Sequence, residues 1–477
     1  MRISVIGTGY LGATHAACLA ELGFDVLGVD NDRRKIAMLS NGDAPFSEPG
    51  LDELLNRHVQ SGRLHFTTSL CEAADFADVH FICVGTPQTQ SGSADVSGVF
   101  AVARGLAGHI TRDCLIIGKS TVPVGTADLL GSLVEDLVPP GVTAGLAWNP
   151  EFLREGHAVQ DTLRPDRLVF GVTTVEAETT LRRIYERPIT AGTRVHVTDL
   201  ATAELAKVAA NAFLATKISF INSMADVSDR SGADVVVLAD ILGDDSRIGR
   251  RFLDAGIGFG GGCLPKDIRA FSARATELGA HTAAGLLHEV DAINLGVRER
   301  TVDLANEMCG WSMRGRRVAV LGAAFKPLSD DVRDSPALYV AGQLHLQGAV
   351  VRVYDPEANN NARALLPALT YVASADAAMS GADLVLHLTE WPEFAAIDPH
   401  HAGSLVRHRR IIDGRNRLDR DRWSLADWTF RGIGRGAQPF VGAHRDVAAA
   451  LPEQVGVEGR DLLERTLARG GPGGRLP

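Results

Sequence analysis

Disulfide and zinc patterns are absent from this sequence. Its 477 residues include six cysteines, none in a Cys-x-x-Cys pair and none near histidines at the spacing of a zinc site. A disulfide framework and a zinc centre both need such regular spacing, so we expect neither, and no other metal. Scattered free cysteines are typical of the reducing cytoplasm, where we expect the protein to be located.

Long apolar runs and basic tracts are missing as well. No apolar stretch approaches the roughly 20 residues that cross a bilayer. The chain starts directly with Met-Arg-Ile-Ser-Val-Ile-Gly, which leaves no room for a signal peptide. The net charge is -10 and lysines and arginines form no block, so the composition gives no sign of a nucleic-acid partner. We therefore expect a soluble protein that binds neither membranes nor nucleic acid.

A dinucleotide fingerprint is present at the N-terminus. Apolar residues 3–6 lead into Gly7-Thr8-Gly9-Tyr10-Leu11-Gly12, a helical pattern follows, and apolar residues 26–29 end in Asp30. Gly7 permits the tight turn, Gly9 lets the backbone approach a pyrophosphate, and Gly12 allows close helix packing. Asp30 would accept hydrogen bonds from the adenosine ribose and repel a 2′-phosphate. The motif therefore predicts NAD rather than NADP as cofactor.

Two later strands end in turns that contain threonine. Residues 79–84 run into Gly85-Thr86-Pro87, and residues 115–118 run into Lys119-Ser120-Thr121. An open parallel sheet binds its ligands at the carboxyl ends of its strands, so we expect both threonines to contact cofactor or substrate. The alternative is that they only cap the helices that follow.

A long helical pattern covers residues 199–232. At 1.5 Å per residue it predicts a helix of about 50 Å, which is long enough to join two domains. Lys207 and Asn211 stand four residues apart and therefore share one face. The alanines at 203, 206 and 210 favour close packing of this helix; the alternative is an ordinary solvated stripe.

The most distinctive segment surrounds one cysteine. Residues 258–267 read Gly-Phe-Gly-Gly-Gly-Cys-Leu-Pro-Lys-Asp, so Cys263 follows a glycine run and precedes Lys266 and Asp267. Glycine lets substrate approach the main chain closely, and a nearby ammonium favours the thiolate over the thiol, whose ordinary pKa is about 8.5. We predict a reactive thiol. The alternative is a buried structural cysteine in a glycine-rich turn.

A second nucleotide-type half follows. Residues 317–321, 350–354 and 383–388 repeat the apolar runs of the first half, but Ala-Ala-Phe-Lys-Pro at 323–327 replaces the glycine fingerprint. We expect the same fold with a different ligand. Phe325 can stack on a ring, while Lys326 and Arg415 supply cations for phosphate or sugar hydroxyl groups.

Together these patterns predict an α/β protein with two Rossmann-like, doubly wound domains joined by a long central helix. A chain of 477 residues also exceeds what a single core organises. We place the NAD-binding domain at residues 1–198, the central helical domain with the cysteine loop at 199–312 and the second Rossmann-like domain at 313–436. Residues 437–477 are rich in Gly, Pro, Arg and Glu, and we expect a disordered tail there.

Several motifs occur in an order that carries a family resemblance. Besides the fingerprint, the Lys207 helix and the Cys263 loop, they are Ser-Thr-Val-Pro-Val-Gly-Thr at 120–126, Asn-Pro-Glu-Phe-Leu-Arg-Glu-Gly at 149–156, Phe-Lys-Pro at 325–327 and Asp-Asp-Val-Arg-Asp-Ser-Pro at 330–336. From residue 1 to about 435 the chain resembles the UDP-glucose 6-dehydrogenase family of nucleotide-sugar dehydrogenases.

The resemblance implies an activity. The C6 alcohol of UDP-glucose would be oxidised to UDP-glucuronate with two NAD and one water, through a thiohemiacetal and a thioester on Cys263. The implied catalytic residues are Cys263, Lys207, Asn211, Asp267, Thr121, Glu151 and Glu155. Glu155 would lie nearer the nicotinamide and Glu151 nearer the hydrolysis step, but the base that activates the water stays open among Glu151, Glu155 and Asp267. The alternative substrates are GDP-mannose and a UDP-N-acetylhexosamine.

The resemblance also implies ligand contacts. The cofactor set is Gly7, Gly9, Tyr10, Leu11, Gly12, Asp30, Lys35, Thr86, Thr121, Glu155, Lys266 and Arg333. The substrate set is Glu151, Phe152, Leu153, Arg154, Lys207, Asn211, Arg247, Phe252, Leu253, Asp254, Ala255, Gly256, Gly260, Phe325, Lys326 and Arg415. Arg247 would reach the neighbouring subunit's active site in a homodimer joined through the central helices. Phe252, Asp254 and Gly262 differ from the residues common at these positions, which bears on the identity of the sugar.

Overall fold

The computed structural model describes residues 1–436. The predicted tail at 437–477 lies outside the described residues. Within residues 1–436 no helix combines the length and the apolar character that crossing a bilayer requires.

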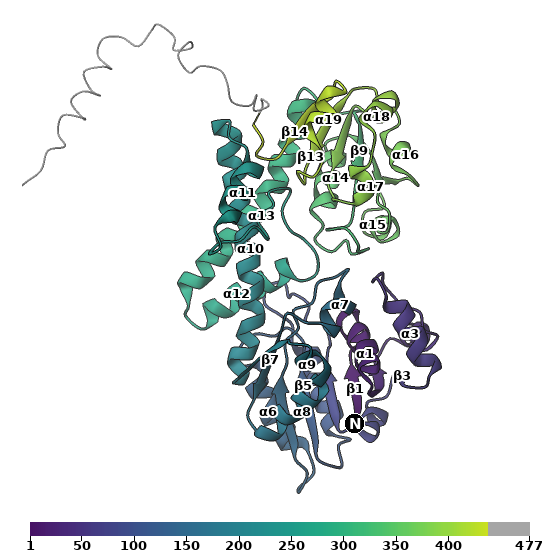
Figure 1. Cartoon of the computed structure of the whole chain (residues 1–477), viewed down its shortest axis with the longest axis vertical. Helices are drawn as coiled ribbons and strands as arrows, with labels where there is room; N and C mark the ends of the chain where they lie inside the picture. Colours follow the sequence, from purple (N-terminus) through teal and green to yellow (C-terminus); the bar gives the residue numbers. More distant parts are fainter. Residues whose placement is uncertain (437–477) are drawn as a thin grey trace, which may run out of the picture. The chain divides into compact units, whose positions relative to one another are not determined.

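An eight-stranded sheet forms the N-terminal part of the chain (Figure 1). Its order is β3-β2-β1-β4-β5-β6-β7-β8, and every pair is parallel except β6 with β7. The strands are β1 Arg2–Ile6, β2 Asp25–Val29, β3 Leu64–Thr67, β4 Val79–Ile82, β5 Cys114–Gly118, β6 Ala144–Trp148, β7 Arg167–Val172 and β8 Arg194–Thr198. The strand order reverses between β1 and β4, and such a switch point is where open sheets bind nucleotides.

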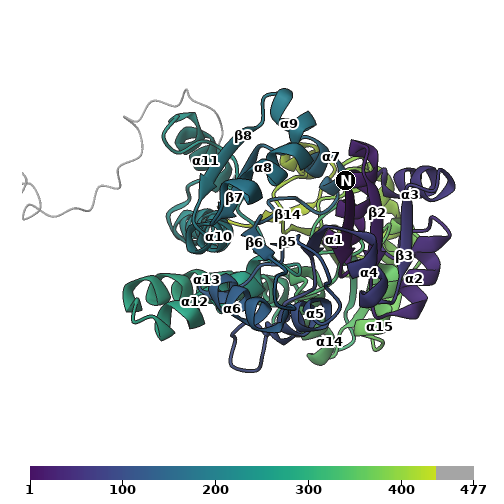
Figure 2. The same ribbon diagram turned by 90° about the horizontal axis from the view of Figure 1, so that it is seen from below.

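Helices cover both faces of this sheet (Figure 2). Ile3 and Val5 of β1 belong to one apolar core and Ile6 to the other, because successive side chains of a strand point to opposite faces. The helices are α1 Tyr10–Leu22, α2 Arg33–Ser40, α3 Leu51–Gln60, α4 Leu70–Phe76, α5 Ser97–Ala107, α6 Thr126–Leu137, α7 Ala158–Leu163, α8 Val175–Ile184 and α9 Glu186–Thr190.

Four helices link the first sheet to the second. They are α10 Leu200–Ser231, α11 Val235–Asp244, α12 Leu264–Glu277 and α13 His281–Met308. The side chain of Asp199 caps α10 by accepting from the N–H of Thr202, and Gly232 ends the helix in the left-handed conformation at φ 81°. Ser219 of α10 donates to the carbonyl of Val290 on α13 at 2.7 Å. The predicted long helix is thus confirmed, with its ends within one residue of the predicted range.

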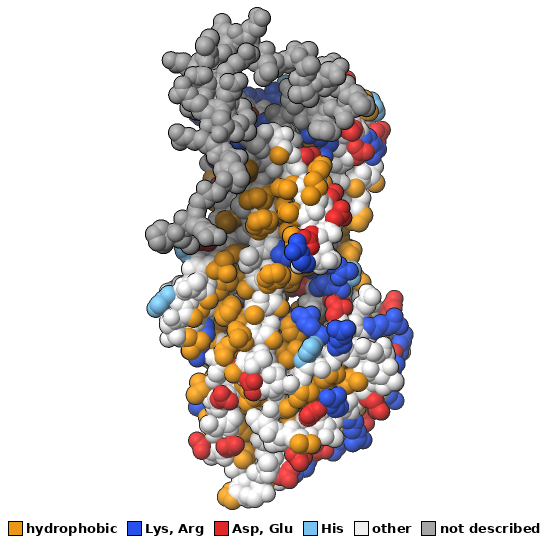
Figure 3. All heavy atoms as spheres, turned by 60° about the vertical axis from the view of Figure 1, so that its left-hand side comes forward, with side chains coloured by type: hydrophobic (Ala, Val, Ile, Leu, Met, Phe, Trp, Pro, Cys, Tyr) orange, Lys and Arg blue, Asp and Glu red, His pale blue; other side chains and the backbone are white. Residues whose placement is uncertain are grey.

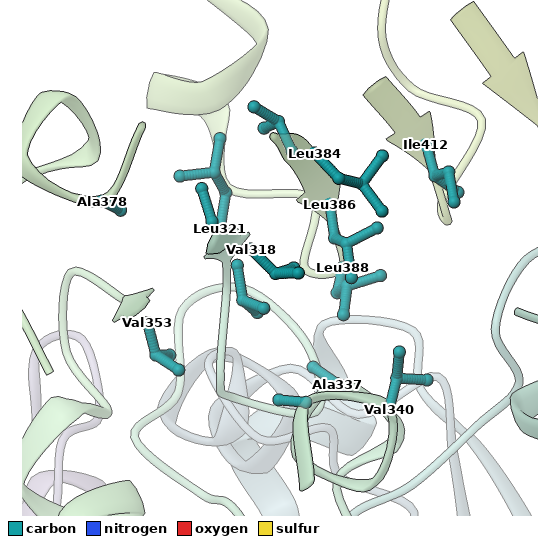
Figure 4. Packing of buried hydrophobic residues seen from close by; sticks show 14 of the residues in the cluster. Val318, Leu321, Ala337, Val340, Val353, Ala378, Leu384, Leu386, Leu388 and Ile412 are labelled. Carbon is teal, nitrogen blue, oxygen red and sulfur yellow. The ribbon is translucent and has the colours of Figure 1, made fainter. Parts of the chain in front are cut away.

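The C-terminal sheet has six parallel strands in the order β11-β10-β9-β12-β13-β14. They are β9 Arg317–Leu321, β10 Val350–Tyr354, β11 Thr370–Tyr371, β12 Leu384–His387, β13 Arg410–Asp413 and β14 Thr429–Gly432. The helices are α14 Pro336–Leu346, α15 Asn359–Leu365, α16 Ala375–Met379, α17 Pro392–Ala395, α18 Pro399–Leu405 and α19 Arg420–Leu425. Figure 4 shows Val318 and Leu386 of the sheet packed with Ala337 and Val340 of α14. The predicted fold class, two Rossmann-like sheets with a long helix between them, is confirmed.

Candidate functional site

The turn after β1 has the geometry of a pyrophosphate site. Gly7 has φ 94°, and a Cβ at Gly12 would lie 1.8 Å from the carbonyl oxygen of Gly7, so neither position accepts a side chain. A Cβ at Gly9 would instead meet no atom within 4 Å. In the described structure no side chain caps α1, so its first N–H groups remain available for an anion. The predicted turn fits a dinucleotide.

Asp30 lies at the end of β2 and organises the same turn. Its Oδ2 accepts from the N–H of Thr8 at 2.9 Å and from Lys35 Nζ at 2.8 Å. Burial on its own would raise the pKa of Asp30, but Lys35 and the N–H of Asp32 outweigh burial and lower it. Asp30 is therefore a carboxylate at the position predicted for the ribose contact, and Lys35 lies beside it.

The glycines before Cys263 let other segments approach its loop. A Cβ at Gly260 would lie 2.4 Å from the carbonyl oxygen of Asp334, and one at Gly262 would lie 2.2 Å from the guanidinium carbon of Arg333. The loop therefore lies directly against residues of the second half. Cys263 itself is the N-cap residue of α12, and Pro265 occupies the first turn of that helix.

The state of the thiol differs from the sequence-based expectation. Cys263 has solvent-exposed surface, but protein atoms crowd the sulfur. The loss of water contacts raises the pKa of Cys263 to about 12, the Glu151 carboxylate adds to the rise, and Lys207 only partly offsets it. A neighbouring ammonium does favour the thiolate, as expected, but burial and the carboxylates outweigh the effect of Lys207. The resting group is a thiol.

Two buried pairs line the thiol. Lys207 Nζ lies 2.8 Å from Glu151 Oε1, and Asn211 Nδ2 donates to Asp267 Oδ2 at 2.7 Å. Lys207 and Asn211 are only 5% and 8% exposed, so the solvated-stripe alternative is wrong. Although burial opposes it, Glu151 raises the pKa of Lys207. The shared helix face thus presents an ammonium and an amide to the cysteine loop.

The threonine turns meet at the same place. Thr86 Oγ1 donates to the carbonyl of Thr121 at 2.7 Å. Lys266 Nζ lies 3.4 Å from Thr86 Oγ1 and 2.6 Å from Asp267 Oδ1. The alternative role as helix caps is wrong for both threonines, because α5 begins after Val96 and α6 after Gly125.

Glu155 lies where the two sheets' loops meet. Its Oε1 is 3.3 Å from Arg333 Nη2, and its backbone carbonyl accepts from Lys326 Nζ at 2.7 Å. Burial raises the pKa of Glu155 to about 7; Asp331 adds to the rise, whereas Arg333 and Lys326 oppose it. The group therefore exchanges protons near neutral pH.

Other predicted substrate residues have structural partners. Arg415 donates from Nε, Nη1 and Nη2 to the carbonyls of Leu388, Gly258 and Phe325 at 2.8, 2.9 and 3.1 Å. It therefore ties the cysteine loop to the second half. Phe252 adopts the strained φ of 65°, and Gly256 donates its N–H to Asn222 Oδ1 at 2.9 Å.

The segment at 152–154 carries the remaining contacts. Arg167 lies over the ring of Phe152 at 3.8 Å, Leu153 donates its N–H to Glu151 Oε2 at 2.7 Å, and Arg154 forms a two-pronged ion pair with Asp161. Two residues of the set lie apart from the thiol's neighbours: Asp254 pairs with Arg250 and Arg417, and Arg247 has an 87% exposed side chain that pairs with Asp245.

Sequence reasoning missed three buried charged residues around the site. Glu204 accepts from the N–H groups of Gly125 and Ala127 at 2.7 and 2.6 Å, and burial raises its pKa to about 7. Lys119 donates to Asn149 Oδ1 at 3.0 Å, and burial lowers its pKa to about 8. Glu48 binds the loop after Glu155. Only Glu204 had a signal, because it shares a helix face with Lys207.

A dinucleotide turn, in a chain whose cysteine is surrounded by carboxylates and a lysine, is typical of an NAD-dependent oxidoreductase. Comparison with protein families makes the class specific. The NAD binding, central and UDP binding domains of the UDP-glucose/GDP-mannose dehydrogenase family match residues 1–189, 201–295 and 319–420. The chain belongs to this family, and NAD is its cofactor.

Relatives match nearly the whole chain. A UDP-glucose 6-dehydrogenase of Pseudomonas aeruginosa is 40% identical over 91% of this chain and 98% of its own length. The UDP-glucose 6-dehydrogenase TuaD of Bacillus subtilis is 42% identical over 91% and 94%. The solved structure of a UDP-glucose dehydrogenase from Pyrobaculum islandicum has a TM-score of 0.84 at 38% identity and covers 91% of this chain and 97% of its own.

Proposed function

We propose that this protein oxidises the C6 alcohol of UDP-glucose to UDP-glucuronate, using two NAD and one water. The relatives of about 40% identity carry that substrate in their names, and a UDP binding domain matches residues 319–420. The observation that carries the proposal is the thiol itself. Lys207, Glu151, Glu155 and Asp267 all lie close enough to Cys263 to shift its pKa.

The first oxidation needs a site for negative charge. Bound NAD supplies the hydride acceptor for both oxidation steps. The C6 hydroxyl gives its proton to a water held beside Asp267, and the C6 hydrogen leaves as hydride to NAD. As this happens, Lys207 and Asn211 stabilise the developing oxyanion, because they are held on one helix face by Glu151 and Asp267. Asp267 and Thr121 hold the reacting hydroxyl or water. The product of this step is an aldehyde.

The second oxidation uses the sulfur. Because the pKa of Cys263 is about 12, its proton must leave as the carbon–sulfur bond forms, and the ionised form of Glu155, with a pKa of about 7, accepts it. The resulting thiohemiacetal loses its C6 hydrogen as hydride and becomes a thioester. Water then breaks the carbon–sulfur bond, which releases the carboxylic acid and restores the thiol. Glu151, Glu155 and Asp267 are the carboxyl groups beside this thiol that can activate the water.

The stoichiometry of NADH tests this function. We expect two NADH for each UDP-glucose consumed, and lower kcat/KM with GDP-mannose and UDP-N-acetylhexosamines. In Cys263→Ser the rate of acid formation should fall by about 1,000-fold or more, because the second oxidation loses its nucleophile. Cys71→Ser, at an exposed cysteine on α4, is the matched control and should behave as wild type. A single NADH per sugar, or acid formed by Cys263→Ser at the wild-type rate, would contradict the proposal.

A homodimer through the central helices is part of the proposal. The exposed apolar side chains of α10 include Leu205, Phe213, Phe220 and Val227, which recur at about seven-residue spacing and therefore share a face. Figure 3 brings forward the side on which Figure 1 labels α10 to α13, and it shows hydrophobic side chains gathered there. Phe213→Glu should shift the protein toward monomer in light scattering, whereas Leu425→Glu, at an 83% exposed leucine on α19, should not. A dimer that survives Phe213→Glu would argue for another interface.

Two further points complete the proposal. Domain boundaries at 1–198, 199–312 and 313–436 are supported by the two separate sheets and the helices between them. A cytoplasmic location is supported by the six cysteines, all of which are free thiols.

A further inference from the structure

One peptide bond beside the thiol is held from two sides. The carbonyl oxygen of Glu155 accepts from Lys326 Nζ at 2.7 Å, and the adjoining N–H of Gly156 donates to Glu48 Oε2 at 2.7 Å. Lys326 belongs to the loop after β9, whereas Glu48 belongs to the loop between α2 and α3. The peptide that carries Glu155 is therefore fixed between the cofactor-binding half and the second half.

Glu48 is fully engaged in this contact. Its other oxygen, Oε1, accepts from the N–H of Ala158 at 2.7 Å, and Tyr10 donates its hydroxyl to Oε2. The residue is 6% exposed. Phe46, two residues earlier, packs on the ring of Tyr10 with centroids 4.7 Å apart. Tyr10 is the first residue of α1, directly after the glycine turn.

The second half packs closely against the other side of this loop. Gly156 has φ 78°, and a Cβ there would lie 2.8 Å from the carbonyl oxygen of Leu328. Leu328 is itself strained, with φ 61°. Glu48 and Tyr10 hold the backbone on one side, and residues 326–328 close it on the other, so a change at Glu48 is transmitted to the Glu155 carboxyl.

We propose that Glu48 is a positioning residue for the reaction: together with Tyr10 of the cofactor turn, it fixes the Glu155–Gly156 peptide so that the Glu155 carboxyl stays buried beside Cys263. The inference rests on the proposed function for its kinetic consequence, since it assigns Glu155 a proton-accepting role. A mere cap for the six-residue helix α7 would not require the hydroxyl of Tyr10.

The pKa of Glu155 reports whether its carboxyl group stays buried. The charged and titratable groups that face it are Asp331, Arg333 and Lys326 from the second half and Cys263 from the thiol loop, with Tyr10 and Glu48 on the cofactor side. Burial is the largest cause of its raised pKa. If the loop loosens, water reaches the carboxyl and its pKa falls, so the acidic limb of the kcat profile moves to lower pH.

The test compares Glu48→Gln and Tyr10→Phe with wild type. Glutamine places an N–H group against a backbone N–H, so we expect kcat to fall roughly tenfold at saturating NAD and sugar, because a buried donor loses its acceptor. Tyr10→Phe keeps the charge of Glu48 and should shift the acidic limb in the same direction by less. Glu53→Gln, at an exposed residue of α3, is the control and should match wild type.

A second measurement does not need turnover. Amide hydrogen exchange at residues 154–159 should accelerate in Glu48→Gln and in Tyr10→Phe, with exchange in β1 unchanged. Faster exchange with unchanged kcat and an unmoved acidic limb would overturn the positioning role, and so would unchanged exchange. If the wild-type protein oxidises a different nucleotide sugar, the proposed function is wrong. The comparison of Glu48→Gln and Tyr10→Phe with wild type is then made with that sugar, and it still tests the positioning role. A lower melting temperature in Glu48→Gln, with kcat and the acidic limb unchanged, would mean that Glu48 only caps α7 and would overturn the positioning role.

Discussion

The six strands of the second sheet repeat the order of the first six strands of the first sheet, but the two sheets use the end of their first strand differently. After β1, helix α1 starts at Tyr10, only three residues beyond Gly7. After β9, helix α14 starts at Pro336, fourteen residues beyond Gly322. The short turn brings a helix N-terminus to the switch point, where it can bind a pyrophosphate. The longer turn also returns to the end of β9, where Ser335, the N-cap residue of α14, donates to the carbonyl of Ala323 at 2.7 Å. The Ser335 side chain accepts from the N–H of Leu338, so in the described structure this helix N-terminus is capped by the protein itself, unlike that of α1.

The acidic residue at the end of the second strand differs in the same way. Asp30 Oδ2 accepts from Thr8 and from Lys35. Asp355 Oδ2 accepts from the N–H groups of Ala323 and Ala324 and from the indole of Trp391, while its Oδ1 accepts from the N–H groups of Glu357 and Ala358. Asp355 is 1% exposed, so it stabilises the loop and leaves no acceptor for a ribose.

The comparison shows how one fold acquires two roles. The first half keeps its turn short and presents it to a cofactor. The second half lengthens the same turn, and Lys326, Ser329 and Arg333 on that turn reach Glu155 of the first half at 2.7, 3.5 and 3.3 Å. The second half therefore contributes to the catalytic loop as well as carrying the UDP binding domain match.

We expect the largest effect from Gly9→Ala, which tests whether the turn after β1 binds the pyrophosphate. No protein atom lies within 4 Å of the added Cβ, so we expect the melting temperature to stay near that of wild type. The methyl group enters the path of the pyrophosphate, and KM for NAD should rise about 50-fold, as expected for a steric cost of 2–3 kcal/mol. Gly285→Ala, which also has open space in α13, should leave KM unchanged. Unaltered NAD kinetics in Gly9→Ala would place the cofactor elsewhere.

Local patterns made much of the fold predictable. Hydrophobic periodicity with Asp199 and Gly232 at its ends predicted α10, and the glycine spacing predicted the turn from β1 into α1, because both features depend on neighbours in the chain. The Cys263 loop and the Lys207–Asn211 face were also found from spacing. In these parts of the site, the reactive residues are close to one another in the sequence, so their spacing along the chain is enough to find them.

Long-range contacts were not predictable. The pKa of Cys263 depends on Glu151, 112 residues earlier, and on burial that only the packed chain creates. The carboxylate of Glu48 lies in a loop with no helical or strand period, so nothing local indicates that it binds Gly156. Arg415 was predicted to bind a ligand from its charge and from the family resemblance, and that role stays a prediction. Its three carbonyl partners lie on three separate loops, so no local pattern indicated them.

Asp30→Ala and Asp355→Ala compare the acidic residues at the ends of β2 and β10. Asp30→Ala should raise KM for NAD roughly tenfold, because one ribose acceptor is lost, with a smaller effect on NADP. Asp355→Ala removes the partner of four buried donors and one part-buried donor. It should lower the free energy of unfolding by about 2–4 kcal/mol, while KM for NAD stays within about twofold of wild type. Urea unfolding and steady-state kinetics measure the two effects. An altered NAD KM in Asp355→Ala would mean that the loop held by Asp355 takes part in cofactor binding.

We expect the smallest effects from substitutions in the loop between β9 and α14, which should change the pKa of Glu155. Arg333 lowers the pKa of Glu155 and Asp331 raises it, so the two substitutions should act in opposite directions. In Arg333→Ala the pKa rises, less carboxylate is present below pH 7, and kcat at pH 6 should fall about threefold relative to its value at pH 9. In Asp331→Asn the pKa falls and kcat at pH 6 should increase. Profiles at saturating NAD separate this from weaker cofactor binding. If both variants moved the acidic limb the same way, Glu155 would not be the group that titrates.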